Sequence, residues 1–257
     1  FRVLKDCIKR KDIISGRQVH DIVKKNLLET NAFLGSHIIR MYASCGSLFD
    51  ATEVFHKLSN PSIFSWGAII SAHSTLGHME EAISLYYAMC SSNLKPDGHV
   101  FVAVLKACSD SCSLRDGRLI HIDVVGYNLY SNVFVTNILV DMYCKCGSLR
   151  DAQAVFDMSQ EQTLVTWGAL LSGCIQCGSP KKALYLFYKM QLKGLEMDNG
   201  VCISVLQACG SLKNAYFGKL IHIFVVESGN DSDLLMVSTL IDMYSKCGEM
   251  ENAQHMF

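Results

Sequence analysis

The residue types that most readily do chemistry in this sequence are cysteine and histidine, which number 12 and 9. Cys174 and Cys177 form a Cys-x-x-Cys pair, and His78 and Glu80 form a His-x-Glu pair. Zinc-dependent deaminases hold their metal ion and move a proton with these residue types, in a signature that has a proline before the first cysteine of its pair. No proline precedes Cys174, and the two pairs fall in different repeats of the array described below. The sequence therefore predicts neither a metal site nor a catalytic centre.

Six of the other cysteines and three histidines recur at a fixed interval. The interval is 101 residues in three series: Cys7, Cys108 and Cys209; Cys45, Cys146 and Cys247; and His20, His121 and His222. Residues of one series occupy equivalent sites in different repeats and do not meet. We therefore expect the cysteines to act as small buried hydrophobes at helix contacts. Their thiols are expected to stay unpaired, which fits a reducing compartment. We expect the histidines to make interface contacts. With no Gly-rich phosphate loop and no nucleophile-and-base pair, the sequence predicts no enzymatic activity and no cofactor.

Longer stretches keep the same interval. The segment 36–55 matches 137–156 at ten of twenty positions, and the pattern returns from Ser238. Val104-Leu-Lys-Ala-Cys108 has counterparts 101 residues before and after it, and Trp66-Gly-Ala68 has one 101 residues after it. Self-similarity at a fixed period is the signature of a repeat architecture.

The 101-residue period divides into repeats of 31, 35 and 35 residues. Each has the length of two amphipathic helices, with apolar residues three to four positions apart and a glycine such as Gly46 or Gly77 at the turn between them. Because two such helices cannot bury their apolar faces alone, we expect neighbours to stack into an all-α superhelical solenoid with the first helices on its concave wall. The whole chain is predicted to be one array: a partial repeat 1–31, then 32–62, 63–97, 98–132, 133–163, 164–198, 199–233 and a partial repeat 234–257.

The composition agrees with a continuous helical core. Apolar residues make up 50% of the sequence, charged residues 18%, and only 3 residues are proline. The formal net charge of −1 gives no overall attraction to nucleic acid or to an anionic membrane. No apolar run reaches the roughly 18 residues that a membrane-spanning helix needs. The chain begins at Phe1 inside a repeat, so any targeting peptide is expected to lie outside this sequence.

The 35–35–31 rhythm, with its Val-Leu-Lys-Ala-Cys, Asp-Met-Tyr-x-Lys-Cys-Gly and Ser-Trp-Gly motifs, closely resembles the PLS class of plant pentatricopeptide-repeat (PPR) proteins over the whole chain. In that class the 31-residue repeats are of type S, the tryptophan-bearing repeats 63–97 and 164–198 of type P, and the others of type L. The resemblance implies a right-handed superhelix that binds single-stranded RNA, one base per repeat. It further implies the recognition segment of a mitochondrial or plastid RNA-processing factor, most often one for C-to-U editing. Editing cofactor proteins are implied as further partners, and neither a membrane nor a small-molecule substrate is.

The resemblance also implies which residues contact the bases. In the family the fifth and last residues of a repeat choose the base, and the second residue packs against its face. The fifth residues here are Ser36, Gly67, Val102, Asn137, Gly168, Ile203 and Ser238, preceded by Phe1, which pairs with Asn31. The last residues are Ser62, Asp97, Asn132, Thr163, Asp198 and Asp233. The second residues include Phe33, Phe64, His99, Phe134 and Val165.

Two departures from the family pattern shape the prediction. Gly67 and Gly168 offer no side-chain hydrogen bond where the family usually has a small polar residue, often Asn. The carboxylates of Asp97 and Asp198 can only accept hydrogen bonds, so they are predicted to prefer the ring N–H of guanine or uracil. Two alternatives stay open: repeats of type L act as spacers that keep the others in register, or the array is a protein–protein scaffold. The near-neutral charge favours the scaffold, whereas the rhythm and the polar residues at base-reading positions favour RNA.

Overall fold

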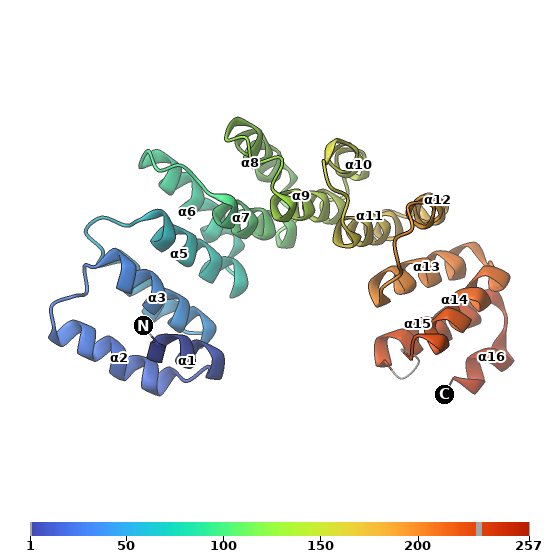
Figure 1. The fold of residues 1–257 in the computed structure, drawn as a ribbon, viewed down its shortest axis with the longest axis horizontal. Coiled ribbons are helices and arrows are strands. Elements are labelled where there is room, and N and C mark those ends of the chain that lie inside the picture. The colour runs from blue at the N-terminus through green and yellow to red at the C-terminus, as the bar shows by residue number, and fades with distance from the viewer. Residues whose placement is uncertain (1, 230–232, 257) are drawn as a thin grey trace. The chain divides into compact units, whose positions relative to one another are not determined.

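The computed structural model of the protein describes residues 2–229 and 233–256, and within those ranges it contains sixteen α-helices and no strand. The helices follow one another as helix–turn–helix pairs (Figure 1). They form two compact parts, here called the N-terminal half (Phe1–Ile138) and the C-terminal half (Leu139–Phe257), which divide within α9. The predicted all-α fold of helix pairs is confirmed.

The first helices of the repeats are nearly uniform in length. All have 13 or 14 residues except α1, which has nine described residues. Their bounds are α1 (Arg2–Arg10), α3 (Ala32–Ser44), α5 (Ile63–Thr75), α7 (Gly98–Asp110), α9 (Val133–Lys145), α11 (Leu164–Gln176), α13 (Asn199–Leu212) and α15 (Leu234–Cys247).

The second helices vary in length with the repeat. In the 31-residue repeats α4 and α10 have nine and ten residues, whereas the second helices of the 35-residue repeats have 13. The shorter repeats therefore lack about one helical turn, and they lack it in the second helix. The bounds are α2 (Ile13–Lys25), α4 (Leu48–His56), α6 (Met79–Ser91), α8 (Leu114–Gly126), α10 (Leu149–Met158), α12 (Pro180–Leu192), α14 (Ala215–Glu227) and α16 (Met250–His255).

In the N-terminal half the first helices lie side by side in one layer (Figure 1). Helix α5 contacts α3 on one side and α7 on the other, and α6 packs against α7. Ile69 and Phe101 are fully buried between these helices. The ring of Trp66 meets that of Phe55 edge-on, with 4.7 Å between the ring centroids. Large apolar side chains therefore fix the spacing of the layer.

The C-terminal half repeats this arrangement. Helix α13 contacts α11 and α15, and α12 packs against α13. Trp167 meets Phe156 edge-on at 4.6 Å between ring centroids, in the same register as the pair in the N-terminal half. The tryptophan is therefore a core residue in both copies of the motif, which reads Ser-Trp-Gly in one and Thr-Trp-Gly in the other.

Left-handed residues make the turn between the two helices of a repeat. Gly46 and Gly147 have φ of +78° and +76°, which glycine adopts without a steric penalty. In the helix pairs α1–α2, α7–α8 and α13–α14 a residue with a side chain takes this conformation instead: Lys11, Cys112 and Lys213, with φ of 53° or 54°. Glycine therefore marks the turns of the other helix pairs in the sequence but leaves those of these three pairs unmarked.

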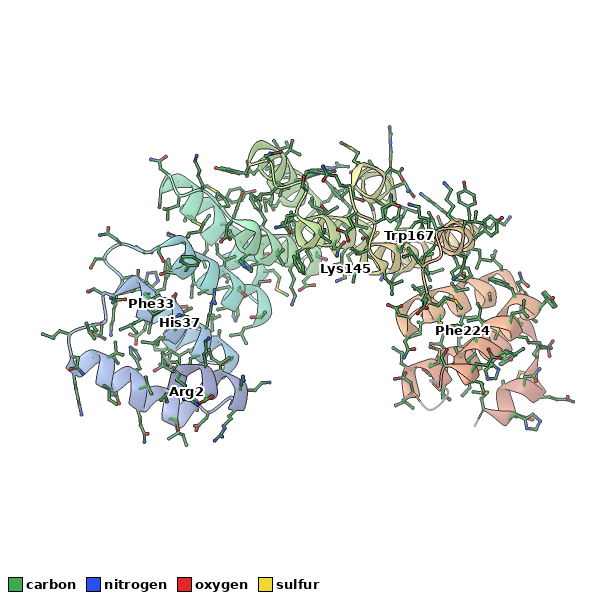
Figure 2. The ribbon with its side chains drawn as sticks, viewed as in Figure 1. Arg2, Phe33, His37, Lys145, Trp167 and Phe224 are labelled. Atoms are coloured by element: carbon green, nitrogen blue, oxygen red, sulfur yellow. The ribbon has the colours of Figure 1, made fainter. Side chains whose placement is uncertain are left out.

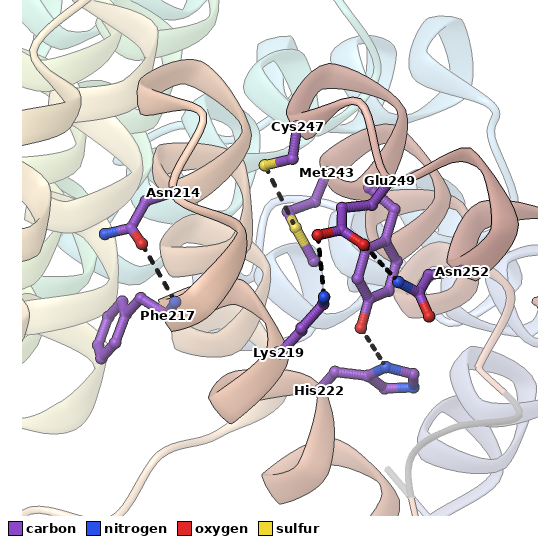
Figure 3. Close-up of polar contacts among 9 residues, drawn as sticks. Asn214, Phe217, Lys219, His222, Met243, Cys247, Glu249 and Asn252 are labelled. Atoms are coloured by element: carbon purple, nitrogen blue, oxygen red, sulfur yellow. Dashed lines mark hydrogen bonds and ion pairs between the residues drawn. The ribbon is translucent and has the colours of Figure 1, made fainter.

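Polar contacts join neighbouring helix pairs: α13–α14 to α15–α16, and α1–α2 to α3–α4. In the C-terminal half Lys219 on α14 pairs with Glu249 at 2.9 Å, and His222 Nδ1 lies 2.8 Å from the Tyr244 hydroxyl (Figure 3). In the N-terminal half Arg17 pairs with Asp50 at 3.0 Å, and His20 Nδ1 lies 2.9 Å from the Tyr42 hydroxyl. The predicted interface role of His20 and His222 is confirmed, and His121 stacks on Tyr130 with 5.6 Å between centroids.

The cysteines make no disulfide among the described residues. Cys7, Cys108 and Cys209 are buried, and burial raises the pKa of the Cys209 thiol to about 12. Cys45, Cys146 and Cys247 are only half-buried. In the part of the chain that the structure describes, no three His, Cys, Asp or Glu side chains are grouped so as to hold a metal ion. Nor does a described helix have the length and apolar character to cross a bilayer.

Candidate nucleic-acid interface

Exposed side chains mark the second position of the repeats, at the start of the first helices. His99 is exposed there, and the ring of Phe33 meets that of His37 edge-on at 4.8 Å on α3 (Figure 2). Flat nucleobases stack on aromatic rings that are left in water in this way. The apolar residues at this position are more than 60% exposed: Phe33, Phe64, Phe134, Val165 and Leu235.

The last residue of each repeat has a structural role that the sequence interpretation did not include. It caps the first helix of the next repeat. Asp97 Oδ1 accepts a hydrogen bond from Val100 N at 2.9 Å, and Asp198 Oδ1 accepts one from Val201 N at 2.8 Å. Capping occupies one carboxylate oxygen and leaves lone pairs on the other. The remaining last residues cap their following helices in the same way: Asn31, Ser62, Asn132, Thr163 and Asp233.

The fifth residues lie one turn further along the same helices and differ in what they present. Ser36 is only 4% exposed, and its Oγ donates to the Phe33 carbonyl at 2.8 Å. Ser238 is exposed, and its Oγ donates to the Leu235 carbonyl at 2.9 Å. Both hydroxyls have given their proton to the helix, so each retains only acceptor capacity. The others are half-buried: Gly67, Val102, Asn137, Gly168 and Ile203.

A hollow on the first-helix face of the N-terminal half lies over α5, and we call it the α5 hollow. Its volume is about 430 Å³. It brings the predicted second, fifth and last residues Phe64, Gly67 and Asp97 together, with His99 from α7. The exposed ring of Phe64, the backbone of Gly67 and the carboxylate of Asp97 therefore line one hollow, which has a size suited to a small ligand.

Two neighbouring hollows in this half have related linings. The predicted pair Ser36 and Ser62 lines a hollow of about 580 Å³ together with Phe33. The predicted pair Val102 and Asn132 lines one of about 380 Å³ together with Phe134.

The C-terminal half has a corresponding hollow over α11, the α11 hollow, of about 800 Å³. Gly168 and Asp198, the counterparts of Gly67 and Asp97, line it together with Val165 and Ile203. Where the α5 hollow has an aromatic ring, the α11 hollow has the smaller Val165.

The other predicted base contacts do not share a described hollow. Asn137 belongs to the N-terminal half, and Thr163, which caps α11, belongs to the C-terminal half. Asp233 caps α15 without lining the hollow that contains Ile203. Phe1, the predicted partner of Asn31, lies outside the described residues. The base-reading roles of all these residues stay predictions.

Two cations at the α5 hollow were not singled out from the sequence. Arg40 on α3 and Lys106 on α7 both line it, and both are exposed. Burial lowers the pKa of His37, and the positive charges of Arg40 and Lys5 lower that pKa further, so cationic side chains cluster around this helix. A signal was available, because Arg40 and Lys106 occupy the same ninth position of their repeats.

Stacked helix pairs with a hollowed first-helix face define an α-solenoid of short repeats. The family model described as the PPR repeat family matches residues 61–110, and the PPR repeat model matches 134–162, 165–195 and 236–257. The chain belongs to the pentatricopeptide-repeat family.

Relatives from Arabidopsis thaliana align with nearly the whole chain. The chloroplastic pentatricopeptide repeat-containing protein At4g18520 is 34% identical over 255 residues, which are 99% of this chain and 41% of that protein. The chloroplastic At4g25270 is 36% identical over 257 residues, 99% of this chain and 48% of that protein. The mitochondrial At3g09040 is 35% identical over 242 residues, 94% of this chain and 24% of that protein. The chain thus spans less than half of each, and their locations agree with the predicted organellar localisation.

Solved structures share the fold. The maize pentatricopeptide repeat protein PPR10 aligns with a TM-score of 0.77 at 15% identity, over 98% of this chain and 37% of its own. PPR10 in complex with an 18-nt psaJ RNA element aligns with a TM-score of 0.79 at 19% identity, over 94% of this chain and 36% of that one. The solenoid fold predicted from the repeat is therefore confirmed.

Proposed function

We propose that the chain binds single-stranded RNA along its first-helix face, as the recognition segment of an organellar RNA-processing factor. The observation that carries the proposal is the α5 hollow, where Phe64, Gly67 and Asp97 line one space. A base that stacks on Phe64 turns its hydrogen-bonding edge toward the carboxylate. The RNA complex of PPR10, which has the same fold, and the chloroplastic and mitochondrial relatives support the proposal.

The two aspartates, Asp97 and Asp198, lead us to expect a preference for particular bases in the bound RNA. Each carboxylate retains an oxygen that can only accept, and guanine and uracil present a ring N–H on their Watson–Crick edge. Adenine and cytosine present a lone pair there. A carboxylate oxygen that faces this lone pair makes the binding free energy less favourable by roughly 1–3 kcal/mol if both groups are desolvated. Asp97 and Asp198 are three repeats apart, so G or U is expected at two positions with two bases between them. The base that faces Asn137 and Thr163 lies between those positions, and by family likeness it leans toward a pyrimidine.

Selection from a random pool of single-stranded RNA tests this preference. The wild-type chain should enrich G or U at the two positions, without a strong choice between them because Gly67 and Gly168 have no side chain. Asp97→Asn and Asp198→Asn should each relax the preference at one position only, because Asn still caps a helix. Enrichment of A or C at both positions, or no response to either substitution, would overturn the assignment of the aspartates.

The finer part of the proposal is membership of the PLS class and a role in C-to-U editing, with no catalytic activity in this segment. The 101-residue period and the second helices α4 and α10, shortened by about a turn, support it. Sequencing organellar transcripts from plants that lack the gene tests it. Loss of editing at one or a few cytidines is the expected result. Intact editing with altered transcript ends or splicing would replace editing by another processing step.

A specific observation favours protein binding as a second function, as expected for editing cofactors or for a scaffold. The outer helices of two L repeats carry apolar residues that are 44–67% exposed and three positions apart. They are Leu119, Ile122 and Val125 on α8, and Leu220, Ile223 and Val226 on α14. Binding of a protein partner alongside RNA agrees with the editing role. Binding of a protein partner with no affinity for any single strand would favour the scaffold.

A further inference from the structure

The ninth residue of the repeats distinguishes the two halves of the chain. It lies one turn beyond the fifth residue on the same helix face, so it borders a hollow without belonging to the base-reading pair. In the N-terminal half this position holds Lys5, Arg40, Ser71 and Lys106. In the C-terminal half it holds Asp141, Ser172, Gln207 and Asp242. The ninth residues are therefore mostly cationic in the N-terminal half and acidic or neutral in the C-terminal half.

Two cations of the N-terminal half, Arg40 and Lys106, are positioned for an external partner. Arg40 and Lys106 come from the helices on either side of α5, line the same hollow as Phe64, and are exposed. Among the residues that the structure describes, neither makes an ion pair or a side-chain hydrogen bond. Exposed cations that no carboxylate neutralises remain available for an anion.

The C-terminal half neutralises its ninth residues internally. Asp141 pairs with Lys145 at 2.9 Å, and Asp242 pairs with Lys246 at 2.7 Å, each one turn apart on its own helix. Gln207, the counterpart of Lys106, lines the α11 hollow as a neutral side chain. Lys246 also lines that hollow, but its charge is balanced by Asp242. Among the described residues that line the α11 hollow, no cation therefore lacks a carboxylate partner.

We propose that Arg40 and Lys106 bind phosphodiester groups of single-stranded RNA, so that the N-terminal half anchors the strand and the C-terminal half contacts bases without such an anchor. This inference rests on the proposed function. Phosphate contacts hold a strand in register, and base contacts then select the sequence. The α5 hollow supplies both, because Phe64 offers a stacking surface and Asp97 an acceptor within the same lining. The two cations outnumber the single carboxylate there, which favours the negatively charged backbone.

The salt dependence of RNA binding by the whole chain tests the inference. The probe is a fluorescently labelled 12-nucleotide single strand of mixed U and G, titrated at several salt concentrations. Each phosphate neutralised contributes about −0.7 to the slope of log K against log salt for single strands. The double variant Arg40→Gln/Lys106→Gln should therefore flatten the slope by about 1.4, and at low salt it should weaken binding by about tenfold.

A matched control removes the same two charges from the other layer. Arg115→Gln/Lys25→Gln changes one arginine and one lysine that are exposed at second helices, α8 and α2. This control should leave the slope within about 0.3 of wild type, since these charges lie away from the hollow. The gain-of-function variant Gln207→Lys should steepen the slope by about 0.7. Circular dichroism of all the variants should match the wild type.

The outcomes separate this inference from the proposed function. A wild-type chain that binds the RNA, with equal slopes for the hollow variant and the control, would overturn the phosphate contacts and leave RNA binding in place. A wild-type chain that binds no single strand at all would overturn both. A flattened slope for the hollow variant alone, with steepening by Gln207→Lys, would establish the anchor.

Discussion

The α5 hollow and the α11 hollow occupy the same place in two periods of the chain, and they agree in one respect while differing in another. Both combine a glycine at the fifth position with an aspartate at the last: Gly67 with Asp97, and Gly168 with Asp198. Their surroundings differ at every other predicted or inferred contact. The counterparts of Phe64, His99 and Lys106 are valine, glycine and glutamine. The predicted base-reading pair is retained, while the aromatic and charged side chains around it change.

The retained aspartates have a reason to persist that does not depend on RNA. Asp97 and Asp198 each cap a helix through Oδ1, and an uncapped helix start would leave a backbone donor unsatisfied. Phe64, by contrast, is 61% exposed and holds no element in place. Identity between two copies therefore indicates folding where a residue caps or packs, and differences at exposed positions indicate where binding properties can vary.

The second helices of the two halves also differ at a buried position. In the N-terminal half Tyr86 on α6 is fully buried and donates to Asp123 on α8 at 2.8 Å. In the C-terminal half the corresponding residues are Phe187 and Phe224, and Phe187 lies 6.0 Å from Phe217 between ring centroids. One junction is a hydrogen bond and the other is aromatic, yet α6–α7 and α12–α13 pack in the same order.

The largest expected difference between the hollows concerns stacking. Phe64→Ala should weaken RNA binding by about 1–3 kcal/mol, roughly 5- to 150-fold, because a base loses its aromatic platform. Val165→Ala should change binding by less than about twofold, since valine offers no aromatic face. Both side chains are more than 60% exposed, so neither variant should lose stability. Fluorescence anisotropy with one RNA measures both, and equal losses would contradict the distinction between the two hollows.

The next effect concerns what the hollows share. Asp97→Ala and Asp198→Ala should each lower the free energy of unfolding by about 1 kcal/mol, because each removes an N-cap. Asp97→Asn and Asp198→Asn should cost close to nothing, since Asn caps as well as Asp. Urea denaturation followed by circular dichroism measures all four. If the Asn variants lost as much as the Ala variants, the carboxylate charge rather than the cap would be responsible.

A smaller effect is expected at the outer-helix junction. Tyr86→Phe should lower the free energy of unfolding by about 0.5–1 kcal/mol, because it removes a hydrogen bond whose acceptor, Asp123, is only half-buried and can take water instead. The reciprocal change Phe187→Tyr adds a hydroxyl where Phe224 replaces the acceptor Asp123, so it should also destabilise. A neutral result for both would mean that water already satisfies these groups.

The fold could be predicted because the residues that recur with the 101-residue period are core residues and turn residues. Trp66 and Trp167 recur 101 residues apart and fill equivalent core sites, and Gly46 and Gly147 recur where the chain needs a left-handed residue. The left-handed turn at Cys112 could not be predicted, because nothing in its residue type favours that conformation.

The candidate site was harder to predict, because its residue types serve two purposes. An Asp before a helix is a capping signal as much as a ligand contact, and the sequence interpretation took only the second. The cations were missed for another reason. A net charge of −1 for the whole chain conceals 14 Lys and Arg against 12 Asp and Glu in the N-terminal half, and 9 against 12 in the C-terminal half.

The smallest expected effect on stability tests the glycines themselves. A Cβ at Gly168 would meet no other atom within 4 Å, and one at Gly67 would lie 3.4 Å from Val100 Cγ2, so both positions have room for a side chain. Gly168→Asn should raise the free energy of unfolding by a few tenths of a kcal/mol, since Asn is the better helix former. Gly173→Ala on the same helix is the contrasting control. Its Cβ would clash with the Cys144 side chain, so it should destabilise.

The functional consequence of Gly168→Asn separates shape from hydrogen bonding as the source of base preference. The new amide both donates and accepts, so beside Asp198 it adds a contact that can tell guanine from uracil. Selection from a random RNA pool should then sharpen the loose G or U choice at that position to one base, while the position read by Gly67 and Asp97 stays loose. Gly67→Asn should transfer the effect to the other position. If neither substitution sharpened its own position, the fifth residue would have no part in selecting the base, and the aspartates alone would set the preference.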